Sequence, residues 1–225
     1  MQGNKKIAFV TGGSRGIGSA ICRKLLEAGY EVIAPNREQL ELSDIQGVRQ
    51  YLLENENLEP SVVVINAGEN NPKQISQINL EDWQHTLDVN LTSAFLLIQA
   101  FSKRMLDQGG GKIVAISSCY SVRSREGRSA YSVSKAGLNS FVQSAALEFA
   151  KGGVLINAVA PGFVLTDLTA QNNDEMGILR LTEQIPLGRL AMPEEIAEFV
   201  CFLTSEKNTY ITGQLIPIDG GFLCR

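Results

Sequence analysis

A tyrosine and a lysine four residues apart, Tyr131 and Lys135, have side chains suited to proton transfer. Residues at this spacing project from one face of an α-helix, so the phenol and the ammonium group can converge. A phenol has an ordinary pKa of about 10 and transfers protons slowly at neutral pH. We expect the Lys135 ammonium group to lower the pKa of Tyr131, because an adjacent cation favours the phenolate. The pair predicts proton transfer to or from the oxygen of a carbonyl group whose carbon accepts a hydride.

A glycine-rich turn follows the apolar run Ile7–Val10 and precedes a helical pattern, which is the context of a phosphate-binding loop. Side chains at its glycines would keep a diphosphate away from the positive end of the helix. The spacing Gly-x-x-x-Gly-x-Gly differs from the common Gly-x-Gly-x-x-Gly, and the Lys-Ser/Thr ending of a nucleoside-triphosphate loop is missing. A kinase or ATPase is therefore not expected, whereas a plain connecting turn remains the alternative. The dinucleotide contacts predicted in this turn are Gly12, Ser14, Arg15, Gly16, Ile17 and Gly18.

Short β-branched runs alternate with longer helical patterns along the whole chain, which is typical of an α/β protein with a doubly wound parallel sheet. We expect a single domain over residues 1–225, because no linker or repeat interrupts the alternation. Asp44 can begin a helix, and Gly29 and Gly152 can end one. Residues 165–190 show no clear period and are predicted to form a substrate lid. About seven strands are predicted, at residues 6–10, 31–34, 40–42, 62–66, 112–117, 155–158 and 214–218, with helices at 16–28, 44–55, 80–108, 130–151 and 193–205.

Composition and charge describe an ordinary globular chain of 225 residues with a net charge of −4. Its basic residues are scattered, which argues against binding to nucleic acid or to an anionic membrane surface. No apolar stretch approaches the roughly 18 residues of a membrane span, and no signal-peptide core is seen, so a cytoplasmic location is expected. The four cysteines have no metal-ligand spacing, which favours buried free thiols and no metal site.

Polar residues also stand where the predicted strands end: Asn66-Ala67-Gly68, Asn90, Ser118 and Pro161-Gly162. Together with the glycine turn and the Tyr-x-x-x-Lys pair, they resemble the short-chain dehydrogenase/reductase family over essentially the whole chain. The greatest similarity is to the 3-oxoacyl-acyl-carrier-protein reductase group. The resemblance implies a Rossmann fold and reversible hydride transfer between a nicotinamide and a carbonyl or secondary alcohol.

The resemblance also implies roles for individual residues. Tyr131 would be the acid/base, and Ser118, 13 residues before it, would bind the substrate carbonyl; Ser117 is rejected on spacing. Lys135 would tune Tyr131 and hold ribose hydroxyls of the cofactor. Asn90 would bend its helix and hold a water in a proton relay to Lys135. Further cofactor contacts are expected beside the adenosine ribose, at the adenine, and at the nicotinamide and diphosphate, from Asn66, Ala67, Gly68, Leu42, Pro161, Gly162, Val164 and Thr166.

The second predicted strand ends in Ala34-Pro35-Asn36-Arg37, without the carboxylate that would bond a ribose 2′-hydroxyl. Arg37, together with Arg15, could accept a 2′-phosphate, which favours NADP(H) over NAD(H). The alternative is that both arginines are surface charges and that Glu38 or Glu41 folds back to the ribose. Only about five residues join this strand to the next, too few for the helix usual in the family.

Several alternatives for function and assembly remain open. A 3-oxoacyl thioester is the first substrate expected, and a keto-sugar, steroid-like or secondary-metabolite ketone is the alternative. A non-catalytic NADP(H) sensor is disfavoured by the Tyr131–Lys135 pair. His85 and Cys119 are expected to be structural. The apolar residues of the helices at 80–108 and 130–151 predict a homotetramer or homodimer.

Overall fold

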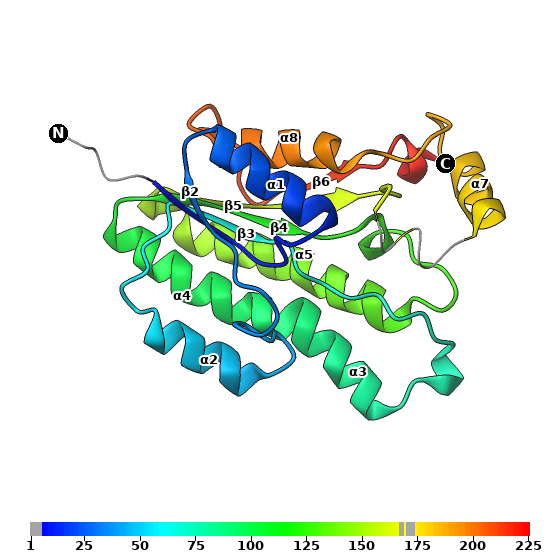
Figure 1. Cartoon of the computed structure of the whole chain (residues 1–225), viewed down its shortest axis with the longest axis horizontal. Helices are drawn as coiled ribbons and strands as arrows, with labels where there is room; N and C mark the ends of the chain where they lie inside the picture. The colour runs from blue at the N-terminus through cyan, green and yellow to red at the C-terminus, as the bar shows by residue number, and fades with distance from the viewer. Residues whose placement is uncertain (1–5, 167–168, 170–173) are drawn as a thin grey trace.

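The computed structural model describes residues 6–166, 169 and 174–225, and its centre is one parallel sheet (Figure 1). The strand order is β2-β1-β3-β4-β5-β6, and every neighbouring pair is parallel. This confirms the doubly wound α/β prediction. All four residues of β3 are buried, as expected for a strand covered on both faces. The strands are β1 Ile7–Val10, β2 Glu31–Ile33, β3 Val62–Ile65, β4 Gly111–Ile116, β5 Val154–Pro161 and β6 Leu215–Ile218.

The predicted strand at residues 40–42 is wrong, and the sheet of the described residues has six strands instead of about seven. Leu40 and Leu42 are buried, so their alternation with Glu41 looked like a strand. The preceding residues form a turn, in which the Asn36 side chain accepts from the backbone N–H of Gln39 and the Gln39 side chain accepts from that of Asn36. These hydrogen bonds of the turn decide the local structure, although the apolar residues alternate as they would in a strand. Leu40 and Leu42 therefore pack against the core from a loop.

Helices cover the sheet on both faces. Figure 1 shows α1 and α8 on one face and α2, α3, α4 and α5 on the other, with α7 at one end. Asp44 caps α2 by accepting from the Gly47 N–H, as predicted, and Gly29 follows α1 with a φ of +88°. At the end of α5 the left-handed residue is Gly153 and not Gly152. The helices are α1 Gly16–Glu27, α2 Ile45–Glu54, α3 Leu80–Leu87, α4 Ser93–Asp107, α5 Ser129–Phe149, α7 Glu175–Glu183 and α8 Pro193–Thr204.

The single helix predicted over residues 80–108 is instead interrupted. A π-helical turn at Asp88–Thr92 separates α3 from α4 and contains the buried Asn90. The hydroxyl of Ser93 donates to the Val89 carbonyl at 2.8 Å and so satisfies one of the backbone groups that the turn displaces. This break presents Asn90 to the carboxyl end of β3.

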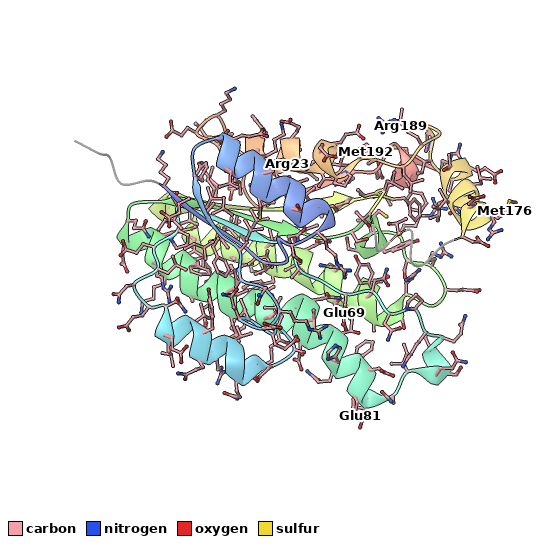
Figure 2. The ribbon with its side chains drawn as sticks, viewed as in Figure 1. Arg23, Glu69, Glu81, Met176, Arg189 and Met192 are labelled. Carbon is pink, nitrogen blue, oxygen red and sulfur yellow. The ribbon has the colours of Figure 1, made fainter. Side chains whose placement is uncertain are left out.

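The predicted lid, residues 165–190, contains α7, which begins after the N-cap Asp174. Figure 2 shows Met176 on the outer side of this helix, and its side chain is largely exposed. Residues 167–168 and 170–173 of the lid lie outside the described residues. The last residue, Arg225, donates to the Glu183 carbonyl at 3.1 Å, so the carboxyl terminus lies at the end of α7.

Within the part of the chain that is described, no helix combines the length and apolarity needed to cross a membrane, and no cluster of side chains could hold a metal ion. The four cysteines are free thiols. Cys119 is buried, and Cys22 and Cys201 are partly buried. Cys224 is exposed, so the prediction of burial is wrong for this residue, which stands next to the chain end.

Candidate active site

A cleft of about 680 Å³ opens at the carboxyl ends of β1, β3, β4 and β5. In doubly wound sheets this edge is where ligands bind, because the loops after adjacent strands meet there. The structure brings every predicted site residue except Asn90 to the walls of this one cleft. They are Gly12, Ser14, Arg15, Gly16, Ile17, Gly18, Arg37, Leu42, Asn66, Ala67, Gly68, Ser118, Tyr131, Lys135, Pro161, Gly162, Val164 and Thr166.

The glycine turn after β1 is held by its neighbours across the sheet. Gly12 and Gly16 have φ values of +66° and +54°, which side-chain-bearing residues rarely adopt. A Cβ on Gly18 would lie 2.1 Å from the Gly12 carbonyl oxygen, so the turn closes only with glycine there. The Asn66 side-chain amide donates to the carbonyls of Thr11 and Gly12, each at 3.0 Å. Asn66 therefore shapes the turn in addition to lining the cleft.

The amino terminus of α1 suits a phosphate group. Within the described residues, no protein group accepts a hydrogen bond from the backbone N–H groups of Gly16, Ile17 and Gly18, and the N-cap residue Arg15 makes no side-chain cap. Free N–H groups at the positive end of a helix form an anion site. The Arg15 side chain is exposed and has no ion pair there. The residues present thus fit the diphosphate of a dinucleotide.

Tyr131 and Lys135 lie in the first two turns of α5, as their spacing predicts. The Lys135 ammonium group donates to the Ile116 carbonyl at 2.8 Å and lies 6.0 Å from the centroid of the Tyr131 ring. Burial lowers the pKa of Lys135 to about 8. Burial also raises the pKa of Tyr131 to about 12, although a hydrogen bond with Ser118 acts in the opposite direction. The expected lowering by Lys135 is therefore wrong for the chain by itself, because burial dominates the pKa of Tyr131 and Lys135 is not among the groups that shift it.

Ser117 and Ser118 both line the cleft, but their hydroxyls have different partners. The Ser118 oxygen accepts from the Tyr120 N–H at 3.1 Å, which leaves its proton free to be donated, and it interacts with Tyr131. The Ser117 hydroxyl donates to the Lys135 carbonyl at 3.4 Å and so faces the backbone of α5. This difference agrees with the choice of Ser118 on spacing.

Asn90 lies behind the cleft wall and fixes the loop after β3. Its side chain accepts from the Glu69 N–H at 2.9 Å and donates to the Glu69 carbonyl at 3.0 Å and to the Ser134 hydroxyl at 3.1 Å. A Cβ on Gly68 would lie 3.0 Å from the Asn90 Oδ1 and 3.1 Å from the Lys135 Nζ. Gly68 thus leaves a space between the amide of Asn90 and the ammonium group of Lys135.

The opposite end of the cleft carries an ion pair. Arg37 donates to Glu41, whose other oxygen accepts from the backbone N–H and the hydroxyl of Ser43. Burial opposes the ionisation of Glu41, but Arg37 and Ser43 outweigh it and lower its pKa to about 2. Arg37 is largely exposed. Arg37 and Glu41, which the sequence placed in competing roles at the ribose, therefore bind each other.

Sequence reasoning missed several cleft residues: Glu69, Asn70, Tyr120 and Phe163. Glu69 and Asn70 continue the Asn-Ala-Gly turn, and Tyr120 follows Ser118 by two residues. Their positions next to predicted site residues could have indicated that they line the cleft. Phe163 had none beyond its place after Pro161-Gly162. His85, partly exposed as expected, interacts with the Glu69 carboxylate at 3.0 Å.

The buried Lys135 predicts a measurable pH dependence of stability. Its pKa is about 8 in the folded chain against an ordinary 10.5, so the unfolded chain binds more protons between these values. The free energy of unfolding should therefore rise from pH 8 towards 10.5 with a slope of at most about 1.4 kcal/mol per pH unit. Urea unfolding at pH 7.5 and 9.5 measures this free energy for wild type and for Lys135→Met. The free energy of unfolding of wild type, relative to that of the variant, should be higher at pH 9.5 than at pH 7.5. An unchanged difference between the two proteins would contradict the assignment.

Comparison with known proteins agrees with this geometry. The family model described as Enoyl-(Acyl carrier protein) reductase matches residues 53–223. The 3-oxoacyl-acyl-carrier-protein reductase FabG of Aquifex aeolicus is 40% identical over 96% of this chain and 96% of its own. An acetoacetyl-CoA reductase of an Acinetobacter species is 36% identical over 96% of this chain and 97% of its own.

Among solved structures, a Beutenbergia cavernae protein with NADP bound at low occupancy, under the working title of an NAD(P)-dependent gluconate 5-dehydrogenase, has a TM-score of 0.92 and 32% identity. The match covers 98% of this chain and 97% of that one. The TM-score shows that the two chains share one fold. The chain belongs to the short-chain dehydrogenase/reductase family and is an NAD(P)-dependent oxidoreductase.

Proposed function

We propose that the enzyme uses NADPH to reduce a carbonyl group, with Ser118, Tyr131 and Lys135 as catalytic residues and Asn90 in support. The observation that carries this proposal is one cleft that combines a helix amino terminus with free N–H groups and the Ser118–Tyr131 pair. The bound nicotinamide would supply or accept the hydride. The chain must then bind the carbonyl oxygen and deliver a proton to it.

The residues divide these tasks by their hydrogen bonds. Ser118, whose oxygen accepts from the Tyr120 N–H and whose hydroxyl interacts with Tyr131, would donate its proton to the carbonyl oxygen as negative charge develops there. Tyr131, whose pKa of about 12 keeps it protonated at neutral pH, would give up the phenolic proton. Lys135 uses one N–H for Ile116 and has others for ribose hydroxyls. A water held by Asn90 in the space at Gly68 would pass a proton to Lys135. Lys135 would then return a proton to the Tyr131 phenolate.

A 3-oxoacyl thioester is the substrate class we propose, because the relatives named above include a 3-oxoacyl-acyl-carrier-protein reductase and an acetoacetyl-CoA reductase. The test is NADPH oxidation, followed by absorbance, with acetoacetyl-CoA and with a panel of cyclic ketones. Turnover of acetoacetyl-CoA well above the cyclic ketones is expected. A cyclic ketone turned over faster than the thioester would redirect the substrate assignment while leaving the reaction class in place.

We further propose that NADP(H) is preferred over NAD(H). Arg15 and Arg37 stand at the cleft wall, Arg15 has no ion pair among the described residues, and a 2′-phosphate could replace Glu41 as the partner of Arg37. This preference implies that Arg15→Ala and Arg37→Ala each weaken NADPH binding about tenfold with little effect on NADH, measured by fluorescence titration. Arg23→Ala is the control, because Figure 2 shows Arg23 on α1 and its side chain pairs with Glu194. If the substitutions weaken the binding of NADPH and NADH equally, the arginines bind the diphosphate that both cofactors contain.

We propose that two regions outside the cleft have functions of their own, one as a substrate lid and one in subunit assembly. The segment around α7 would act as the substrate lid, since it follows the Val164 wall. The α4 and α5 face would pair two subunits, because Phe95 and Phe141 stack edge to face at 5.5 Å there and Phe95 is 39% exposed. Light scattering should give a multiple of 24.5 kDa. A mass of one chain would rule out the assembly.

A further inference from the structure

The face of α5 that carries Tyr131 and Lys135 continues one turn further to Asn139, which is buried. Asn139 does not line the cleft and has no part in the proton transfer proposed above. Its side chain nevertheless contacts the turn that carries Ser118, because its Nδ2 donates to the Ser121 hydroxyl at 2.8 Å. This contact connects the helix of Tyr131 to the turn after β4.

The Ser121 hydroxyl extends the contact to Ser118 itself. It donates to the Ser118 carbonyl at 2.5 Å, and the Ser121 backbone N–H donates to the same carbonyl at 3.0 Å. The amide of Asn139, the hydroxyl of Ser121 and the carbonyl of Ser118 therefore form one chain of hydrogen bonds. Its donors all point towards Ser118, and hydrogen bonds in such a chain strengthen one another.

The other hydrogen bonds that shape the backbone around Ser118 are local. Ser118 has an extended backbone and is the N-cap residue of the short 3-10 helix Cys119–Ser121. Its hydroxyl oxygen accepts from the Tyr120 N–H at 3.1 Å, within the same turn. These bonds fix the shape of the turn, but they do not fix its place relative to α5. The bond from Asn139 acts on that second quantity, which decides how far the Ser118 hydroxyl lies from Tyr131.

The other half of the Asn139 amide indicates why an asparagine is present. Its Oδ1 is buried and has no hydrogen-bond partner among the described residues. A buried acceptor without a partner is costly, and a leucine of similar size would avoid that cost. The nearby residues Leu138 and Val142 of α5 are buried and apolar. Packing alone would favour an apolar residue at 139 too, so we attribute the amide to its donor bond with Ser121.

A second contact between this loop and α5 does not reach Ser118. The hydroxyls of Ser124 and Ser132 lie 2.7 Å apart. Ser124 follows Ser121 by three residues and lies beyond the 3-10 helix. It therefore provides a matched control, a serine hydroxyl that joins the same loop to the same helix without holding Ser118.

We propose that Asn139 and Ser121 are positioning residues, which hold the Ser118 hydroxyl where it and the Tyr131 hydroxyl can reach one carbonyl oxygen. This inference rests on the proposed carbonyl reduction and adds two residues that lie outside the cleft lining. A donor to a developing oxyanion must be held to within about 0.5 Å of its productive position. Loosening the turn should therefore slow the reaction and leave NADPH binding unchanged.

The kinetic test measures kcat/KM in two backgrounds, with NADPH and the faster of acetoacetyl-CoA and a cyclic ketone. Asn139→Leu and Ser121→Ala should each lower kcat/KM about tenfold in wild type but less than about twofold in Ser118→Ala, because an absent hydroxyl needs no positioning. Ser124→Ala should change kcat/KM less than about twofold in both backgrounds. Titration should show the same NADPH affinity in all of them.

Two kinetic outcomes contradict the inference by itself. An unchanged kcat/KM in Asn139→Leu would show that Ser118 needs no such contact. A loss of the same size in both backgrounds is what partial unfolding would produce, and it would remove the positioning role. If Ser118→Ala itself retains the wild-type kcat/KM, the proposed catalytic role of Ser118 fails, and this inference fails with it.

Amide hydrogen exchange measured by NMR tests the geometry without a substrate. The N–H groups of Tyr120 and Ser121 donate to the hydroxyl and the carbonyl of Ser118, so their exchange reports how firmly Ser118 is held. Both should exchange at least about tenfold faster in Asn139→Leu, whereas Val114, in the central strand β4, should exchange no faster. Unchanged exchange at Tyr120 and Ser121 would overturn the inference. Faster exchange in a chain that reduces no carbonyl compound would support the hold on Ser118 and refute only the proposed reaction.

Discussion

Replacing Tyr131 by phenylalanine is expected to lower turnover about a thousandfold while NADPH binding stays within a few-fold of wild type. The ring and its packing remain, but the phenolic proton is lost, and positioned proton transfer contributes on the order of 10²–10⁴-fold. Steady-state kinetics with a neutral ketone and fluorescence titration with NADPH measure the two quantities. Retained turnover would mean that another group supplies the proton.

The control is the second phenol of the cleft. Tyr120 packs edge to face on Tyr131 at 6.5 Å, and its hydroxyl accepts from Arg125. Tyr120→Phe should lose no more than about tenfold with the same neutral ketone, because only the Tyr131 hydroxyl interacts with Ser118. Comparable losses in the two variants would assign the effect to the aromatic wall and not to a proton donor.

Replacing Ser118 by alanine is expected to lower kcat/KM by about 10²–10³-fold, the loss typical of one hydrogen-bond donor to a developing oxyanion. Ser117→Ala is a sharp control. Both serines are buried and line the cleft, but the Ser117 hydroxyl donates to the Lys135 carbonyl and away from substrate. Its loss should change kcat/KM less than tenfold and should instead lower the free energy of unfolding by about 1 kcal/mol.

The double variant Ser118→Ala, Tyr131→Phe tests whether the two hydroxyls act on one oxygen. Because Ser118 and Tyr131 interact, their effects should not multiply, and the double variant should resemble Tyr131→Phe within about tenfold. Fully multiplicative losses would indicate that the residues act on separate steps.

Local spacing predicted much of this site. The glycine turn, the Tyr131–Lys135 pair and Ser118 each stand at a strand end or on one helical face, and the parallel sheet brings those ends together. Runs of Val and Ile located β1, β3 and β4, whereas β5 extends to Pro161, three residues beyond its predicted end.

Electrostatics could not be predicted in the same way. The pKa of Tyr131 is set by burial. Tyr120, which packs on Tyr131, and Phe163, which packs on Tyr120, come from separate loops. The Arg37–Glu41 pair, by contrast, has a spacing of four that sequence alone could have indicated. Leu40 and Leu42 misled because a buried loop can alternate apolar and polar residues without joining a sheet.

The π-helical turn at Asp88–Thr92 limits how the length of this chain can change. A π turn contains one residue more than an α turn, so α3 and α4 are offset by roughly 100° about their common axis. Deleting one residue would give a regular helix that forms more readily by itself. It would also rotate either Asn90 away from Glu69 or the core face with Leu97 and Phe101 away from the sheet. Evolution can therefore vary the flanking loops freely, whereas single-residue insertions and deletions between residues 80 and 105 should be absent from working relatives.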